Sequence, residues 1–232
     1  MAVSSVSAPS TRDGGRFRGL STRVLSAAVL GPILLAAVWF GFPWIDLVAA
    51  LAAPIMVAEW FRLTPGRLVA RGLSFVYAIA AVVALLWLRH QPATGRETVL
   101  WIVVCVWAAD TGAYFLGSIA GGAKLAPRIS PSKTWAGLVG AMCWAAVASA
   151  LMGLIFQLGE TISLALIGVG IAIVDQAGDL LESAAKRRAG VKDSGRLIPG
   201  HGGLLDRIDG FVACLIAVAL VRLAAGGDWP WA

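Results

Sequence analysis

Seven long apolar segments constrain the fold of this 232-residue chain more than any other feature. The chain is 59% hydrophobic and only 14% charged, whereas soluble domains are usually about 45–50% apolar and about 25% charged. Because a helix needs about 20 mostly apolar residues to cross a bilayer, we predict an all-α, polytopic integral membrane protein with about seven transmembrane helices. The predicted spans are residues 24–40, 43–61, 72–88, 98–118, 135–157, 161–181 and 206–225.

Residues 1–23 differ from the rest because they are rich in Ser, Gly and Arg and lack apolar periodicity. Such a segment cannot bury enough apolar surface to fold, so we predict a disordered basic tail. Residues 24–232 are predicted to form a single membrane-embedded domain. The cysteines lie inside apolar runs without metal-site spacing, so neither zinc nor a disulfide is expected. They are Cys105, Cys143 and Cys214.

Lysine and arginine are distributed unevenly between the two sides that these spans define. Sixteen of the nineteen fall in the tail and in the alternate connections 62–71, 124–133 and 186–207. Basic residues accumulate on the cytoplasmic side of membrane proteins. The distribution therefore predicts a protein of a bacterial-type inner (cytoplasmic) membrane, with its N-terminus and the charged segment 186–207 facing the cytoplasm.

Acidic residues occur inside two of the predicted spans. Asp110 lies in one apolar run, and Asp175 and Asp179 lie in another. An ionised carboxylate at the middle of a bilayer costs about 2.5–3.5 kcal/mol, and such residues usually face a bundle interior or a wet cavity. Their i, i+4 spacing places Asp175 and Asp179 on one helix face, with Glu182 and Ser183 a turn further on. The two carboxylates would repel each other there, and a divalent cation or a Lys or Arg partner would relieve this repulsion.

A purely structural explanation of these carboxylates is also open. Glu182 and Asp179 can form ion pairs with Lys186 and Arg187 at the end of their helix. Asp175 can serve as a hydrogen-bond partner between packed helices. For Asp179, which lies one turn deeper than Glu182, we favour a functional role.

The stretch ESAAKRRAGVKDSGRLIPGHGGLLDRID, residues 182–209, concentrates charge between two apolar segments. It holds six Lys and Arg, four acidic residues and a histidine. Asp206 and Asp209 stand at i, i+3 at the start of the last predicted helix, where plain N-terminal capping is the alternative to a functional role. The turn PGHGG before them has backbone N–H groups that can approach an anion closely.

Six basic residues can gather around these carboxylates, although positive charge at the membrane surface explains any one of them. Carboxylates, bases and glycine turns together suit Mg²⁺-bound phosphates. The sequence GxxxxGK[ST] is missing, so a nucleotide would not be held by a P-loop. The basic residues are Lys124, Lys133, Lys186, Arg187, Lys192 and Arg207.

The sequence SAAKRRAGVKDSGRLIPGHGGLLDRID resembles the signature of the phosphatidate cytidylyltransferases, also called CDP-diacylglycerol synthases. That signature runs Ser-x-x-Lys-Arg, four residues, Lys-Asp, and after a short gap His-Gly-Gly-x-x-Asp-Arg-x-Asp. The resemblance covers most of the chain from residue 24 onwards. Further segments that are similar to the family are AEWFRL (58–63), ADTGAYFLG (109–117), KLAPRISPSKTWAG (124–137) and QAGDLLES (176–183).

The resemblance implies a catalytic membrane domain that converts CTP and phosphatidate into CDP-diacylglycerol and pyrophosphate. It implies membrane lipids as surroundings, a homodimer, no nucleic-acid partner, and Mg²⁺ held by Asp179 and Asp206. A second cation near Asp175 or Asp110 is a further hypothesis. Phosphates would be held by Lys186, Arg187, Lys192 and Arg207. The predicted substrate-binding residues are Lys124, Ser130, Lys133, Thr134, Ser183, Asp193, His201, Gly202, Gly203 and Asp209.

Other functions remain open. A CTP-dependent polyprenol or phytol kinase would use the same nucleotide with a lipid alcohol. A cation transporter would also place aspartates in the membrane, but it would spread them over several spans. The sequence DRIDGFVAC also resembles the start of the CDP-alcohol phosphatidyltransferase motif, but the Arg and the later aspartates of that motif are missing.

Overall fold

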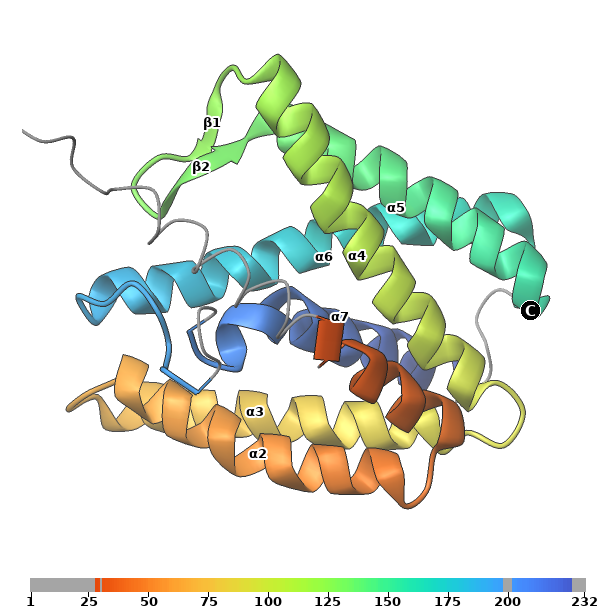
Figure 1. Ribbon diagram of the computed structural model, residues 1–232, viewed down its shortest axis with the longest axis horizontal. Coiled ribbons are helices and arrows are strands. Elements are labelled where there is room, and N and C mark those ends of the chain that lie inside the picture. The colour runs from red at the N-terminus through yellow and green to blue at the C-terminus, as the bar shows by residue number, and fades with distance from the viewer. Residues whose placement is uncertain (1–27, 30, 198–201, 227–232) are drawn as a thin grey trace, which may run out of the picture.

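The computed structural model describes residues 28–29, 31–197 and 202–226. Within these ranges the chain forms long helices and one short antiparallel hairpin (Figure 1). The tail predicted for residues 1–23 lies outside the described residues. The elements are an N-terminal helix (Gly31–Phe40), α2 (Trp44–Leu63), α3 (Leu68–Arg89), α4 (Gly95–Ala120), β1 (Lys124–Ala126), β2 (Ser130–Thr134), α5 (Trp135–Phe156), α6 (Thr161–Arg188) and α7 (Leu205–Ala224).

Five helices, α2 to α6, are long and apolar enough to cross a membrane. This confirms the prediction of an all-α, polytopic membrane protein. The seventh predicted span corresponds to α7, which has 20 residues but carries four charged side chains. The first predicted span is described over residues 28–29 and 31–40, and its helix Gly31–Phe40 is shorter than a full span. The count of seven spans and the single-domain boundary at residue 24 therefore stay predictions.

Helix α6 is longer than its predicted span, because it continues from residue 181 to Arg188. Its 28 residues correspond to a length of about 42 Å, compared with about 30 Å for the hydrocarbon core of a bilayer. The first half of α6 is apolar, and the helix is long enough for its polar last turns to extend beyond the hydrocarbon core. Glu182, Ser183 and Lys186 lie in these last turns.

The helices are arranged in three groups (Figure 1). Helices α4 and α5 pack against each other, α2 packs against α3, and α6 with α7 lies between these pairs. The largest apolar cluster includes Ile45, Leu88, Trp101 and Leu164, so it joins α2, α3, α4 and α6. The indole N–H of Trp101 donates to the hydroxyl of Ser149 in α5 at 2.9 Å.

Glycines permit two close helix contacts. Gly112 of α4 and Gly140 of α5 face each other so closely that a Cβ on either would overlap the other's carbonyl oxygen. A Cβ on Gly178 of α6 would lie 2.8 Å from the backbone oxygen of Asp209 in α7. A Cβ on Gly210 would overlap the carboxylate of Asp175. The second contact brings the acidic positions of α6 and α7 together.

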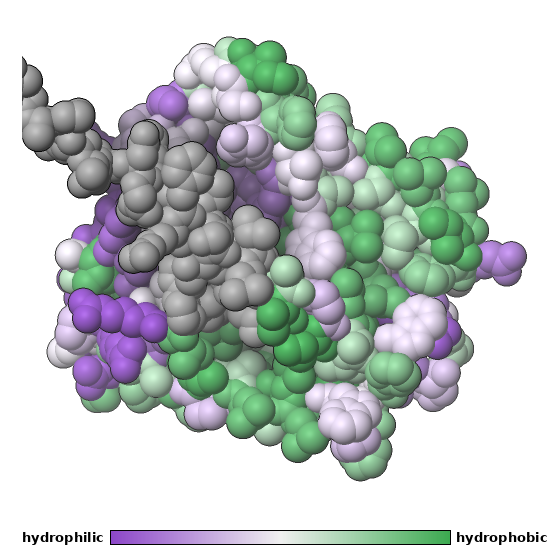
Figure 2. Space-filling model, in the orientation of Figure 1, coloured by the Kyte–Doolittle hydropathy of each residue, from purple (hydrophilic) through white to green (hydrophobic). Residues whose placement is uncertain are grey.

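The basic connections lie at the same end of the bundle. The connection between α2 and α3, the hairpin and the end of α6 all lie on the left of Figure 1, where hydrophilic side chains gather in Figure 2. The opposite end carries the connections after α3 and α5. This arrangement agrees with the alternation of charge in the sequence.

The hairpin at residues 124–134 was not predicted, because its residues carry the polar pattern of a connection. Its strands pair Lys124 with Thr134 and Ala126 with Ser130. The hydroxyl of Thr134, which is predicted to bind substrate, accepts a hydrogen bond from the N–H of Gly137 at 3.0 Å and caps α5. In this structure Thr134 therefore has a structural function.

The glycine contact between α4 and α5 makes a prediction about stability. We expect Gly112→Ala to lower the free energy of unfolding by about 1–3 kcal/mol, because the methyl group must displace backbone atoms. Gly170→Ala in α6 is the control, since a Cβ there meets nothing within 4 Å and alanine favours the helix by up to about 1 kcal/mol. Thermal unfolding in detergent tests this; equal melting temperatures for the two variants contradict it.

Candidate active site

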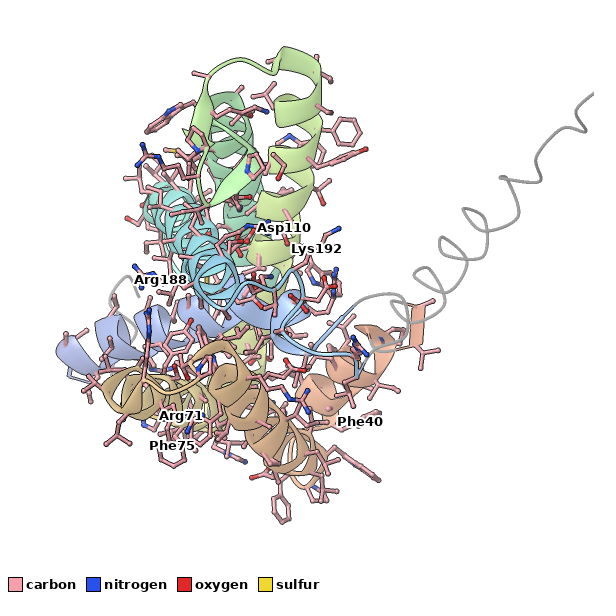
Figure 3. All side chains as sticks on the ribbon, turned by 90° about the vertical axis from the view of Figure 1, so that its left-hand side faces the viewer. Phe40, Arg71, Phe75, Asp110, Arg188 and Lys192 are labelled. Carbon is pink, nitrogen blue, oxygen red and sulfur yellow. The ribbon has the colours of Figure 1, made fainter. Side chains whose placement is uncertain are left out.

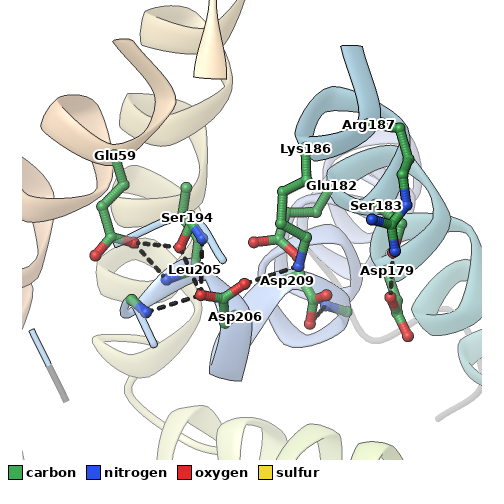
Figure 4. Close-up of polar contacts among 12 residues, drawn as sticks. Glu59, Asp179, Glu182, Ser183, Lys186, Arg187, Ser194, Leu205, Asp206 and Asp209 are labelled. Atoms are coloured by element: carbon green, nitrogen blue, oxygen red, sulfur yellow. Dashed lines mark hydrogen bonds and ion pairs between the residues drawn. The ribbon is translucent and has the colours of Figure 1, made fainter. Parts of the chain in front are cut away.

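Lys186, near the end of α6, joins two carboxylates (Figure 4). Its ammonium group donates to Glu182 one turn earlier and to Oδ1 of Asp206 in α7 at 2.7 Å. The side chains of Glu182 and Asp206 are only 1% and 5% exposed. The structural explanation of Glu182, an i, i+4 pair with Lys186, is thus correct. The same lysine also balances the charge of Asp206.

The other oxygen of Asp206 organises the loop before α7. Oδ2 accepts hydrogen bonds from the backbone N–H of Ser194 at 2.9 Å and from that of Gly203 at 2.7 Å. The hydroxyl of Ser194 lies 3.0 Å from the same oxygen. Gly202 has φ +90°, a conformation that favours glycine. In the described part of the glycine turn, the N–H of Gly203 therefore points at an anion, as predicted, but this anion is the protein's own carboxylate.

Glu59 of α2 is a buried carboxylate that sequence analysis gave no role, although it stands in the segment AEWFRL. It is 2% exposed. It accepts hydrogen bonds from the backbone N–H of Leu204 at 2.9 Å and of Leu205 at 2.8 Å, and the hydroxyl of Ser194 lies 3.0 Å away. An acidic residue near the end of an apolar span was the signal that could have identified it.

Asp179 is paired with a lysine that comes from the hairpin. The ammonium group of Lys133 in β2 lies 2.6 Å from Oδ2 of Asp179 and donates to Oε1 of Gln176 at 2.6 Å. The amide of Gln176 in turn donates to Asp175 at 3.1 Å. Oδ1 of Asp179 accepts from the hydroxyl of Ser183 at 3.2 Å. The ion pair with Arg187, which a purely structural explanation of Asp179 would use, is not formed among the described residues; the Nε of Arg187 donates to the backbone oxygen of Ile129.

Carboxylates from three helices lie near this lysine or near one another. Asp110 of α4 lies within electrostatic range of Asp179 and Asp209, and of Lys133. Asp175 interacts with Asp110 and with the same lysine. Asp209 accepts the N–H of Gly210 at 2.9 Å. Figure 3, which looks onto the left-hand side of Figure 1, labels Asp110 on α4 and Lys192 in the loop after α6. The intramembrane aspartates predicted from the sequence therefore lie within electrostatic range of one another, without converging on a single point.

The remaining basic side chains predicted for the site are exposed. Arg187 donates to the backbone oxygen of Ile129 at 3.3 Å and thus connects α6 to the hairpin. The hydroxyls of Ser130 and Ser132 lie 3.4 Å apart on β2. His201 lies outside the described residues. The other exposed site residues are Lys124, Lys192, Asp193 and Arg207.

The oxygen atoms at the site suit Mg²⁺ chemically, since carboxylates are its preferred protein ligands. Within the described ranges, no group of three or more acidic, histidine or cysteine side chains converges on one point. Asp179, whose side chain is 36% exposed, has one donor on each oxygen among the described residues, and Asp206 has one on Oδ1. Each such oxygen keeps a lone pair. Oε1 of Glu182 is buried without a partner among the described residues.

Carboxylates and basic side chains gathered at one end of a helical bundle suit the binding of Mg²⁺ and phosphate groups. Comparison with protein families identifies the class of enzyme. Residues 66–224 match the cytidylyltransferase family. The chain therefore belongs to this family of nucleotidyltransferases.

Curated relatives narrow the class further. The phosphatidate cytidylyltransferase of Brucella suis is 32% identical over 88% of this chain and 92% of its own length. That of Pseudomonas aeruginosa is 38% identical over 89% of this chain and 73% of its own length. That of Rickettsia bellii is 33% identical over 83% of this chain and 86% of its own length. The resemblance inferred from the signature is confirmed.

The bridge formed by Lys186 makes a prediction about stability. We expect Lys186→Met to lower the free energy of unfolding by about 3–5 kcal/mol, because it leaves two buried carboxylates without their cation. Arg188→Met is the matched control, since Arg188 is exposed on the same turn and should change stability by no more than about 0.5 kcal/mol. Denaturant unfolding in detergent measures both; similar values for both contradict the role of the bridge.

Proposed function

We propose that the chain is a phosphatidate cytidylyltransferase that transfers a cytidylyl group from CTP to phosphatidate. The observation that supports this most directly is the position of the charged site beside a large apolar cavity. A water-soluble nucleotide and a lipid need these two environments next to each other. The curated relatives, which carry this name over most of the chain, support the same reaction.

The apolar cavity has a volume of about 400 Å³ and lies between the N-terminal helix, α2, α3 and α7. Its lining includes Ala52, Met56 and Leu85, and it follows α7 from Leu204 to Leu215. Arg207, next to Asp206, is the charged residue in the described lining. We propose that an acyl chain of phosphatidate occupies this cavity, with its phosphate group toward Arg207.

The proposed reaction is a displacement at phosphorus. An ionised oxygen of the phosphatidate phosphate forms a bond to the α-phosphorus of CTP, and the bond from that phosphorus to the β-phosphate oxygen breaks. Pyrophosphate leaves with the electron pair. A general base is not required, because a phosphate monoester is mostly ionised at neutral pH. The exposed groups of Arg187, Lys192 and Arg207, together with Lys133, would offset the charge of the phosphates.

Mg²⁺ is part of the proposal, with Asp179 and Asp206 as its ligands and Asp110 or Asp175 near a second cation. The lone pairs left on the oxygens of Asp179 and Asp206 support this assignment. When bound, the ion would neutralise the triphosphate and orient the leaving pyrophosphate. Because Lys133 pairs with Asp179, its ammonium group must share this carboxylate with the ion or turn toward the nucleotide.

We also propose that the site faces the cytoplasm and that the protein is a homodimer. The concentration of basic residues at the site end supports a cytoplasmic active site, where CTP is present. A homodimer is proposed on the family resemblance alone.

One assay separates this function from its alternatives. We expect purified protein with Mg²⁺, labelled CTP and phosphatidate to yield a labelled lipid and pyrophosphate. A CTP-dependent lipid kinase would instead release CDP and act on a lipid alcohol. A cation transporter would show ion flux in liposomes without nucleotide. Absence of labelled lipid, with either of these results in its place, contradicts the proposal.

The role of Asp179 is tested in the same assay. We expect Asp179→Asn to lower kcat by at least about 100-fold, because the site loses a charge aimed at the reacting phosphates and their counter-ion. Glu160→Gln is the control, since Glu160 is exposed at the opposite end of the same helix, where it caps the first turn. Near-normal turnover of Asp179→Asn would exclude this residue as a metal ligand.

The lipid cavity makes a separate prediction. We expect Ala52→Phe to lower kcat/KM for a long-chain phosphatidate by about tenfold or more, because the ring takes up space needed by the acyl chain. A short-chain phosphatidate should be affected less. Leu51→Phe is the matched control, since Leu51 is adjacent in α2 and 68% exposed on the outside. Equal losses for both chain lengths contradict the assignment of the cavity.

A further inference from the structure

The N-terminus of α7 is capped by a residue from a distant helix. The N-cap position of α7 is Leu204, whose side chain cannot accept a hydrogen bond. The first N–H groups of a helix need acceptors, and the helix dipole favours a negative charge there. Glu59 of α2 supplies both, because its two oxygens accept the N–H groups of Leu204 and Leu205.

We propose that Glu59 is a positioning residue for the active site, which acts on Asp206 through α7 and Ser194. This inference rests on the proposed function. Asp206 is the second residue of α7. Its position relative to α6 therefore depends on where α7 begins, and Glu59 fixes this point from α2.

The hydroxyl of Ser194 connects the two carboxylates directly. It lies 3.0 Å from Oε2 of Glu59 and 3.0 Å from Oδ2 of Asp206 (Figure 4). A hydroxyl has one hydrogen to donate, so it serves one of these oxygens at a time. Asp206 also has Lys186 as a counter-ion, whereas the described donors to Glu59 are neutral N–H and O–H groups. Glu59 therefore competes for the hydroxyl hydrogen and influences how many donors Asp206 keeps.

The close approach of Glu59 also explains why two positions in the loop are occupied by glycine. A Cβ on Gly195 would lie 2.5 Å from Oε1 of Glu59, and a Cβ on Gly203 would lie 2.5 Å from the same oxygen. Gly203 belongs to the Gly-Gly pair of the signature, which sequence analysis attributed to substrate binding. In this structure its small size makes room for a carboxylate from α2. Glu59 therefore contacts the chain on both sides of the signature turn, at residues 194–195 and 203–205.

The test uses the full-length protein in detergent and the isosteric variant Glu59→Gln. The amide NH₂ of glutamine cannot accept one of the two N–H groups, so the start of α7 loses part of its cap. We expect faster hydrogen–deuterium exchange at Leu204 and Leu205, with little change in the other helices. We expect kcat to fall by about 10- to 100-fold, the usual effect of losing a group that orients a ligand residue. Asp46→Asn is the control, since Asp46 is acidic and lies at the other end of α2.

A second variant keeps the proposal testable if Glu59→Gln does not fold. Ser194→Ala removes only the hydroxyl, and we expect a smaller loss of kcat with an unchanged melting temperature. In the double variant Glu59→Gln/Ser194→Ala, the two losses of kcat should not add, because both substitutions act on Asp206 through the same connection. Independent effects, or a general rise in exchange with normal kcat for the folded fraction, would overturn the positioning role. The exchange measurement needs no substrate, so it remains valid if the proposed reaction itself is not observed.

Discussion

The site depends on the burial of negative charge at one end of the helix bundle. Glu182 and Asp206 are nearly inaccessible to water, and each would be costly there without a donor. Lys186 satisfies both with one ammonium group, and this shared cation fixes the distance between α6 and α7. The loop before α7 and the cap from Glu59 are arranged around the pair. The site is thus a network in which each carboxylate orders a different part of the backbone.

A second network lies beside the first and is built from other elements of the fold. Its cation, Lys133, comes from a hairpin outside the bundle, and its carboxylates come from α4, α6 and α7. Glycine makes this possible, because Gly178 and Gly210 allow α6 and α7 to approach within backbone contact. The first network is largely buried, whereas Asp179 of the second has a side chain that is 36% exposed. Asp206 of the first network both orders the loop before α7 and is a proposed ligand of Mg²⁺, so the two tasks overlap at this residue.

The sequence predicts the helices well and the polar contacts poorly. Apolar length and the alternation of basic connections locate α2 to α6, and intramembrane cost singles out Asp110 and Asp179. The pairing of Asp179 with Lys133 was not predictable, because it joins residues far apart in the chain through a hairpin without a clear strand pattern. Glu59 was missed for a similar reason. A single acid near a helix end can interact with solvent or with a distant backbone, and only the fold distinguishes these cases.

The excess length of α6 has a consequence for how a lipid reaches the site. The helix is about 12 Å longer than the hydrocarbon layer is thick, and in the proposed orientation Lys186 and its partners lie at the depth of the phospholipid headgroups. A phosphatidate molecule carries its phosphate at this depth already. Under the proposed reaction, it can enter the site by lateral diffusion within its own leaflet, while its acyl chains remain in the hydrocarbon layer. The enzyme then avoids the large cost of extracting a lipid, and only the nucleotide must arrive from water.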